Sequence, residues 1–202
     1  MPPRTIVLAS TSRYRRALLD PLGVSYVAAS PHFVEDHALR LSPSSMVEAF
    51  ARGKAESLAE DHPNALIIGS DQIPELDGRV LTKPATHDAA VDQLLALAGR
   101  THVLRTAVAV HDSARALTSC RRVDHRMTMR PLTRALAEAY VARDQPLDCA
   151  GSYRIESLGV LLFESMEGSD HTAIIGMPLS VTAALLREHG VDLLVEATRC
   201  RP

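Results

Sequence analysis

The 202-residue sequence predicts a single α/β domain that has a mixed sheet and flanking helices. Short β-branched runs alternate with longer stretches in which apolar residues recur at helical spacing, and this alternation is typical of α/β domains. Two of the later strand-like runs follow one another with no helix between them, which indicates a mixed sheet. No segment rich in glycine, proline or serine divides the chain, so residues 1–202 are expected to form one domain.

Five runs have the β-branched content, the alternation and the bounding turn residues of strands. They are residues 5–8, 65–69, 103–110, 120–129 and 158–164. The pair Asp77–Gly78 is a strong two-residue hairpin signal after the second run. In an unshifted register this hairpin brings Lys83 opposite Gln72, one pair away from Asp71. A bulge, which Pro74 favours, or a sharp twist is then needed to turn the acid and the lysine to one face.

Helical periodicity fills much of the chain between these runs. The clearest helices are expected at residues 43–60, 88–98, 134–143 and 179–189. Thr86 and Thr133 are N-cap candidates for the second and third helices, because their hydroxyls can accept a bond from a free N–H group. Gly99 and Gly190 stand where the second and fourth helices end.

The segment ASTSRYRR, residues 9–16, follows the first strand and leads into a short helix with Ser12 as its cap. Free N–H groups and the helix dipole favour an anion at such a position. Ser10 adds a hydroxyl, and Arg13, Arg15 and Arg16 add positive charge. This segment alone leaves two alternatives. It either binds an anion, or it is the start of a helix whose basic residues are solvated.

Lysine is rare in this chain: of 22 basic residues only Lys54 and Lys83 are lysines. A compact ammonium suits places where a rigid guanidinium does not fit, although a codon bias toward arginine would produce the same count. On the helix expected at residues 43–60, Lys54 projects from an apolar stripe that includes Val47 and Phe50. A cation at this place either extends to water or meets an anion.

Asp71 comes just as the buried run 65–69 leaves the core. A carboxylate at a strand end beside a lysine suits metal binding, water activation and phosphate neutralisation. A surface ion pair has the same sequence pattern, so the chemistry stays open at this point.

The bulk composition excludes several classes of ligand. A net charge of −2 offers no basic stripe for nucleic acid, and no apolar stretch approaches the roughly 20 residues of a membrane span. The N-terminal residues lack the pattern of a signal peptide, and three widely spaced cysteines form neither a disulfide framework nor a zinc pattern. We therefore expect a cytoplasmic protein with small ligands, without nucleic acid or a membrane as a partner.

Six separated blocks, in their order and spacing, resemble the Maf family of nucleoside triphosphate pyrophosphatases from about residue 5 to residue 190. The blocks are ASTSRYRRALL, SDQ, DGRVLTKP, GRTHVLRT, YVARDQPLDCAGSYRIES and IIGMPLS. The resemblance implies an elongated mixed sheet like that of inosine triphosphate pyrophosphatases, with an active-site cleft between two lobes. It also implies cleavage between the α and β phosphates with a divalent metal cation, Mg²⁺ or Mn²⁺.

The resemblance also implies roles for single residues. Asp71 is the acid that activates water, and Glu35 and Asp71 are the metal ligands, with Asp36 as a rival to Glu35. The phosphate-binding residues are Ser10, Arg15, Lys54 and Lys83. The chain departs from the family pattern at two positions: Arg13 replaces the usual proline and Gly53 the usual glutamate.

Three positions, Tyr14, Gln72 and Glu156, are similar to the selectivity residues of the YceF-like branch of this family, whose substrate is 7-methyl-GTP. Methylation at N7 gives guanine a positive charge, so Tyr14 can stack on the base with a cation–π component. The carboxylate of Glu156 can accept hydrogen bonds from the N1–H and the N2 amino group.

Other functions stay open in the sequence. One alternative is a pyrophosphatase for dTTP and UTP, as in the other large branch, or for other modified nucleotides. A second is a non-catalytic nucleotide-binding regulator of septum formation. The resemblance also suggests a homodimer, which the sequence does not itself demand.

Overall fold

The computed structural model describes residues 4–199, and the chain divides into two compact units. The first unit takes the described residues up to Gln72, then Thr106–Val123, and the described residues from Asp170 to Arg199. The second unit takes Ile73–Arg105 and Asp124–Ser169. The sheet has seven strands in the order β2-β1-β3-β5-β6-β7, with β4 paired to β3.

The strands are β1 (Thr5–Ala9), β2 (Val27–Ala29), β3 (Ala65–Leu76), β4 (Arg79–Val80), β5 (Thr101–Asp112), β6 (Leu117–Met129) and β7 (Phe163–Glu167). β1 pairs in parallel with β2 and with β3, whereas the pairs β3–β4 and β6–β7 are antiparallel. The predicted α/β class with a mixed sheet is therefore confirmed. The elongated shape and the cleft between two lobes stay predictions.

The helices are α1 (Arg13–Leu19), α2 (Pro43–Glu56), α3 (His87–Leu97), α4 (Arg134–Asp144), α5 (Thr172–Ile175), α6 (Leu179–Glu188) and α7 (Leu193–Arg199), with 3₁₀ turns η1 (Asp20–Leu22) and η2 (Leu158–Leu162). The predicted boundaries of α3, α4 and α6 are right within one residue at each end. Thr86 and Thr133 accept hydrogen bonds from Ala89 and Leu136, which confirms both as N-caps.

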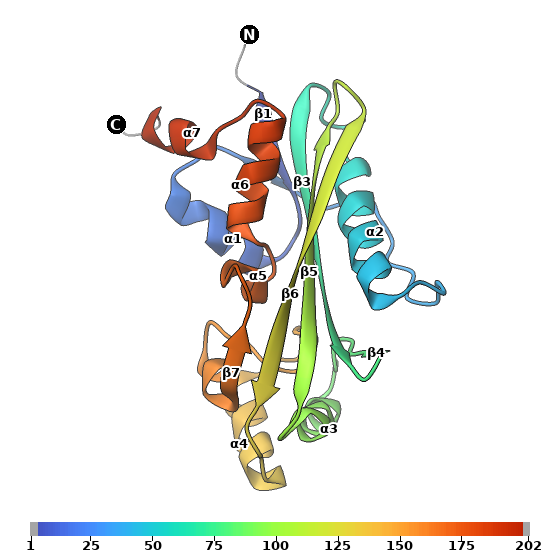
Figure 1. The fold of residues 1–202 in the computed structure, drawn as a ribbon, viewed down its shortest axis with the longest axis vertical. Helices are drawn as coiled ribbons and strands as arrows, with labels where there is room; N and C mark the ends of the chain where they lie inside the picture. The colour runs from blue at the N-terminus through green and yellow to red at the C-terminus, as the bar shows by residue number, and fades with distance from the viewer. Residues whose placement is uncertain (1–3, 200–202) are drawn as a thin grey trace. The chain divides into compact units, whose positions relative to one another are not determined.

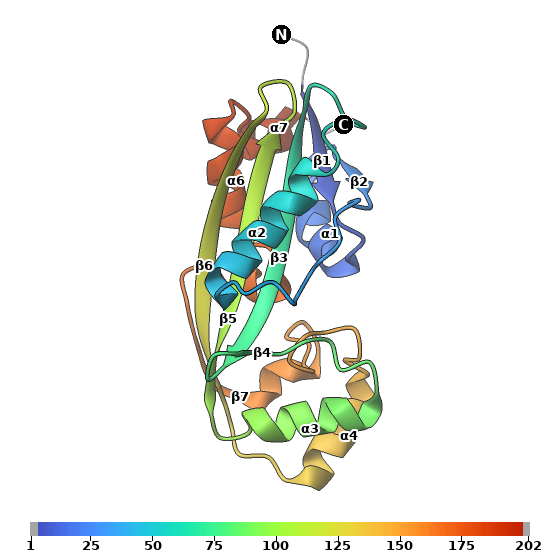
Figure 2. The same ribbon diagram turned by 90° about the vertical axis from the view of Figure 1, so that its right-hand side faces the viewer.

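In the first unit, α2 covers one face of the sheet, and α1 and α6 cover the other (Figures 1 and 2). The core between the sheet and α1, α6 and α7 consists of apolar side chains. Its buried members are Ile6, Leu8, Leu19, Val24, Leu66, Ile68, Val108, Val110, Met177, Leu185, Leu186 and Leu193. In the second unit, α3 packs against α4.

The predicted Asp77–Gly78 turn is confirmed, with φ angles of 50° and 79° that match a type I′ hairpin. The predicted pairing of Lys83 is wrong, however. The ladder holds only Glu75↔Val80 and its neighbouring pair, and β4 ends at Val80. Leu81 still donates its N–H to the carbonyl of Pro74, but the following residues leave the strand.

The strand predicted at residues 158–164 is wrong over most of its length. Residues 158–162 form η2, and the strand β7 begins only at Phe163. Gly159 donates its N–H to the carbonyl of Arg154 at 3.0 Å, and a Cβ on Gly159 would lie 2.3 Å from that oxygen. Because the chain turns back on itself here, the apolar run cannot be extended.

The helix predicted to reach residue 60 ends earlier, at Glu56. The hydroxyl of Ser57 donates to the carbonyl of Lys54 at 2.9 Å and so occupies an acceptor at the helix end. Between residues 4 and 199, no helix combines the length and apolar character needed to cross a membrane.

A buried ion pair joins the start of β1 to the end of β5. Asp112 is fully buried, and Nη1 of Arg4 donates to its Oδ2 at 2.6 Å. The backbone N–H groups of Ala114 and Arg115 also donate to this carboxylate, each at 3.1 Å. The hydrogen bond from Arg4 lowers the pKa of Asp112 to about 2, although burial acts in the opposite direction.

This shift predicts a loss of stability in acid. The pKa of an aspartate in an unfolded chain is about 3.9, so the stabilisation is complete above that pH and disappears as the pH falls through the folded value. We expect the free energy of unfolding to drop by about 2 kcal/mol between a pH of about 5 and about 2. Urea denaturation at several pH values measures it. Asp112→Asn should remove this part of the pH dependence, and an unchanged dependence in the variant would contradict the assignment.

Candidate active site

A buried lysine holds two carboxylates together in the first unit. Lys54, on α2, is 7% exposed, and its Nζ lies 2.6 Å from Oδ1 of Asp71 and 2.6 Å from Oε1 of Glu35. Asp71, on β3, is 6% exposed. Lys54 therefore meets anions instead of extending to water, and it brings together the two acids that the sequence predicts as metal ligands.

The close approach of β3 to α2 places Asp71 at this lysine. A Cβ on Gly69 would lie 2.2 Å from the carbonyl oxygen of Ala51 and 2.6 Å from the nitrogen of Ala55. Only glycine lets the strand pass the helix at this distance. The apolar stripe of α2 includes the fully buried Phe50 and Ala51, so Lys54 sits at the sheet-facing side of the helix.

Glu35 reaches the same lysine from the segment before α2. In this segment alternate residues face α2, since Phe33 and His37 both contact the ring of Phe50. The intervening Val34 is 82% exposed. Asp36 points away and accepts the N–H of Ala38 at 2.9 Å. Of the two rival acids, the structure thus brings Glu35 to Lys54.

The predicted phosphate-binding residues Ser10 and Arg15 also lie together. The hydroxyl of Ser12 accepts the N–H of Arg15 and caps α1, as predicted. Ser10 accepts hydrogen bonds from the N–H of Ser12 at 3.1 Å and from Nη1 of Arg15 at 3.4 Å. Nε of Arg15 donates to the carbonyl of Gly176 at 2.9 Å, where a φ of 125° favours glycine.

Burial and charge act in opposite directions on the ionisable groups of this cluster. Burial raises the pKa of Asp71, and the positive charges of Lys54 and Arg15 oppose that shift. Burial lowers the pKa of Arg15, and the negative charges of Asp71 and Glu35 oppose it. Each charged form therefore depends on its neighbours, as is common where a protein binds or transforms a charged ligand.

The model of the family described as Maf-like protein matches residues 5–189. The chain belongs to the Maf family. A relative from Syntrophotalea carbinolica, named 7-methyl-GTP pyrophosphatase, is 43% identical over 192 residues, which are 95% of this chain and 98% of the relative. A relative of the same name from Pseudomonas putida is 44% identical over 186 residues, 92% of this chain and 97% of the relative. A third, from Pseudomonas aeruginosa, is 39% identical over 188 residues, 93% of this chain and 98% of the relative.

Two of the three predicted selectivity residues, Tyr14 and Gln72, lie in the first unit. The guanidinium carbon of Arg13 lies 4.8 Å from the ring centroid of Tyr14, and Nη2 of Arg13 donates to the Tyr14 hydroxyl. This ring therefore accepts a cation in the structure. The side-chain nitrogen of Gln72 donates to Thr106 Oγ1 and to the carbonyls of Ala173 and Ile174, at 2.7–3.1 Å. Its amide is thus tied to α5, and its role in base selection stays a prediction.

Lys83 and Glu156 belong to the second unit, and both are exposed. The segment that carries Glu156 is held by α4. The hydroxyl of Tyr140 accepts the N–H of Arg154 at 3.0 Å and donates to Asp144 Oδ2 at 2.8 Å, and Ser157 donates to Asp144 Oδ1 at 2.5 Å. The backbone is therefore fixed on both sides of Glu156.

Sequence analysis missed Asp170, which organises the segment leading into α6. Its Oδ1 accepts the N–H and hydroxyl of Thr172, and its Oδ2 accepts those of Ser180, at 2.5–3.0 Å. The N-cap of α6 is Pro178, whose side chain cannot accept a hydrogen bond. Asp170 instead accepts the free N–H of Ser180 in the first turn of the helix. Burial alone would raise the pKa of Asp170, but these hydrogen bonds lower it. The signal was an aspartate two residues before a threonine in GSDHT.

Ser70, next to Asp71, was also missed. Its hydroxyl lies 2.8 Å from the carbonyls of Ala107 and Gly176. The Gly176 carbonyl thus accepts bonds from both Ser70 and Arg15, which ties the turn after α5 to one of the predicted phosphate-binding residues.

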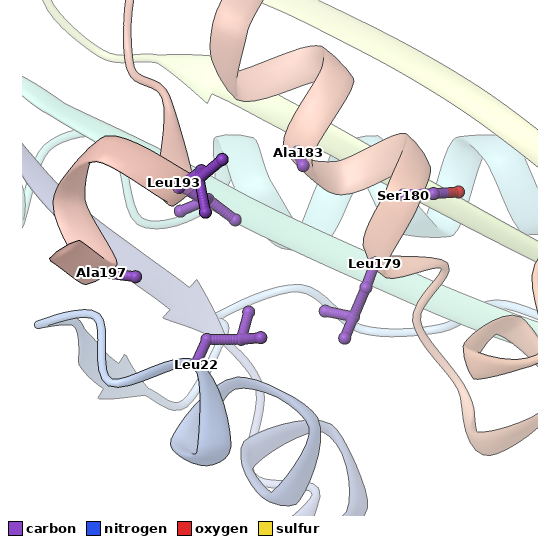
Figure 3. Close-up of a pocket in the computed structure, with 7 residues that line it drawn as sticks. Leu22, Leu179, Ser180, Ala183, Leu193 and Ala197 are labelled. Carbon is purple, nitrogen blue, oxygen red and sulfur yellow. The ribbon is translucent and has the colours of Figure 1, made fainter.

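A separate cavity of about 320 Å³ lies in the first unit between η1, α6 and α7 (Figure 3). Its lining residues are Leu22, Leu179, Ser180, Ala183, Leu193, Leu194 and Ala197. None of these side chains is charged, so the cavity does not suit a triphosphate.

The donor set fits a metal that arrives with a nucleotide. Across residues 4–199, no three His, Cys, Asp or Glu side chains gather in a way that could hold a metal ion. Glu35 and Asp71 supply two carboxylates within reach of one nitrogen. Mg²⁺ is commonly held by one or two carboxylates together with substrate phosphates and water, so these residues fit such a cation.

Proposed function

We propose that the chain is a nucleoside triphosphate pyrophosphatase that hydrolyses 7-methyl-GTP to 7-methyl-GMP and pyrophosphate. The cluster of Asp71, Glu35 and Lys54 carries this proposal, because a buried aspartate and a more exposed glutamate that share one lysine, beside an arginine, suit phosphoryl chemistry. The names of relatives that are 43% and 44% identical over nearly the whole chain support the substrate.

In the proposed reaction, Asp71 orients a water molecule and accepts its proton for in-line attack on a phosphorus atom. Glu35 and Asp71 would be the protein ligands of a bound Mg²⁺ or Mn²⁺, which would stabilise the negative charge of the phosphates. Lys54 holds both carboxylates in place, and its positive charge opposes the rise in the pKa of Asp71 that burial causes. Ser10, Arg15 and Lys83 bind the phosphate oxygens.

For the base, Tyr14 stacks on the cationic 7-methylguanine, as its contact with Arg13 supports. Glu156 accepts hydrogen bonds from the N1–H and the N2 amino group. The reaction removes 7-methyl-GTP from the nucleotide pool before this modified nucleotide enters nucleic acid. The enzyme works in the cytoplasm, with no nucleic acid or membrane as a partner. A homodimer is part of the proposal, and light scattering on the purified chain tests it.

The test compares kcat/KM for 7-methyl-GTP, GTP, dTTP and UTP with Mg²⁺ or Mn²⁺. We expect 7-methyl-GTP to be preferred, with pyrophosphate as a product. A preference for dTTP would support the pyrimidine alternative instead. Nucleotide binding without hydrolysis of any of the four would favour the non-catalytic regulator.

Glu156→Gln should lower the preference for 7-methyl-GTP over GTP by about tenfold, because the neutral amide loses its attraction to the cationic base. The ratio of the two kcat/KM values measures this effect. Glu138→Gln is the matched control, since Glu138 is an exposed residue of α4 in the same unit. An unaltered ratio in Glu156→Gln would remove this residue from base selection.

A further inference from the structure

Gly53 lies inside α2, directly before Lys54, where glycine is a poor helix former. A Cβ at this position would lie 2.2, 2.4 and 2.8 Å from three ring carbons of Phe33. Carbon atoms that are not bonded do not approach so closely. The ring of Phe33 therefore occupies the space that any other residue at position 53 would fill with its side chain.

The same ring also contacts Phe50, one turn earlier on α2, with the ring centroids 5.7 Å apart and the planes at 58°. Phe50 is fully buried and also receives the edge of His37, at 5.2 Å and 86°. Two aromatic contacts thus fasten the segment to α2, one on each side of Glu35.

This attachment places the Glu35 carboxylate. Glu35 is two residues after Phe33 and two before His37, so it faces the helix at the level of Lys54, 2.6 Å from its Nζ. The N–H of His32 donates to Ser57 Oγ at 3.1 Å, which fixes where the segment meets the end of α2. If the Phe33 ring were displaced, the segment that carries Glu35 would move away from α2, and the Glu35 carboxylate would move away from Lys54.

We propose that Gly53 and Phe33 are positioning residues for the active site: the missing side chain of one admits the ring of the other, and the contact sets Glu35 on Lys54. Neither residue touches the reacting groups. The catalytic part of this inference rests on the proposed hydrolysis, whereas the contact itself does not.

Gly53→Ala tests the proposal, because the substitution favours the helix but places a Cβ where the Phe33 ring lies. Alanine is the better helix former, so without the contact between Gly53 and the Phe33 ring the variant would have an equal or higher melting temperature and unchanged kinetics. The proposed contact predicts faster amide hydrogen exchange in residues 31–42 and a fall in kcat for 7-methyl-GTP of about tenfold, since a displaced carboxylate orients the reacting groups poorly.

A second variant tests whether the ring is the cause. Phe33→Leu in the Gly53→Ala background makes room for the new Cβ, and we expect it to restore much of the exchange protection and of kcat. Val34→Ala, at the 82% exposed neighbour of Phe33, should change neither quantity and is the control.

Wild-type exchange in Gly53→Ala would overturn the contact, and faster exchange with unchanged kcat would overturn its positioning role. If the wild-type chain hydrolyses none of the nucleotides, the proposed function fails, but the exchange measurement still decides whether the contact exists.

Discussion

Asp71→Asn is expected to lower kcat for 7-methyl-GTP hydrolysis by a factor of about 10² to 10⁴, the usual contribution of a general base. An amide of the same shape cannot accept the proton of the attacking water, and it is a weaker ligand for a divalent cation. Single-turnover assays at saturating nucleotide measure the effect on the chemical step.

The fold should survive this change. Lys54 keeps Glu35 as a partner at 2.6 Å, so its buried charge is not left alone. The amide also avoids the cost of burying a carboxylate. We therefore expect a free energy of unfolding within about 1 kcal/mol of the wild-type value, measured by urea denaturation.

Asp36→Asn is the matched control. The side chain is exposed, and the oxygen of asparagine can still accept the N–H of Ala38. Its activity should equal that of the wild type. If Asp71→Asn also retained full activity, Asp71 would have no part in the mechanism, and a loss in Asp36→Asn would show that the rival acid was the right one.

The elements that the sequence predicts well have strong local signals. The helices α3, α4 and α6 have regular apolar spacing and local caps or stops, which need no information from the rest of the fold. The failure at residues 158–162 has the opposite origin. An apolar run is compatible with a strand or a turn, and the contact of Gly159 with the backbone of Arg154 decides between them.

Some residues of the site could also be predicted from local signals, whereas others depend on packing between distant segments. Lys54 was visible because a charge within an apolar helical stripe requires an explanation, but its partners come from distant segments. Glu35 and Asp36 are neighbours in a segment without helical periodicity, so only the packing on Phe50 distinguishes them. Gly53 had no local explanation, since its reason is the ring of a residue 20 positions earlier.

Lys54→Met is expected to lower the free energy of unfolding by about 3 kcal/mol and to abolish most activity. Removing one partner of a buried ion pair leaves the other charge without compensation, and that cost is usually about 3–5 kcal/mol. Asp71, which is 6% exposed, loses its hydrogen-bonded cation in this variant. Urea denaturation measures the loss of stability. Lys83→Met is the matched control for stability. Because Lys83 is exposed, the free energy of unfolding of this variant should change by less than about 0.5 kcal/mol. A role of Lys83 in phosphate binding predicts a higher KM.

The double variant Lys54→Met/Asp71→Asn separates stability from function. With both charges removed, no buried carboxylate on β3 lacks a partner, and we expect the double variant to be more stable than Lys54→Met alone. Its activity should stay as low as that of Asp71→Asn. A buried ion pair adds little net stability over neutral residues that pack well. Recovered stability without recovered activity would therefore mean that the chain keeps these charges for the chemistry of the site, whereas a double variant no more stable than Lys54→Met would contradict the coupling between the two residues.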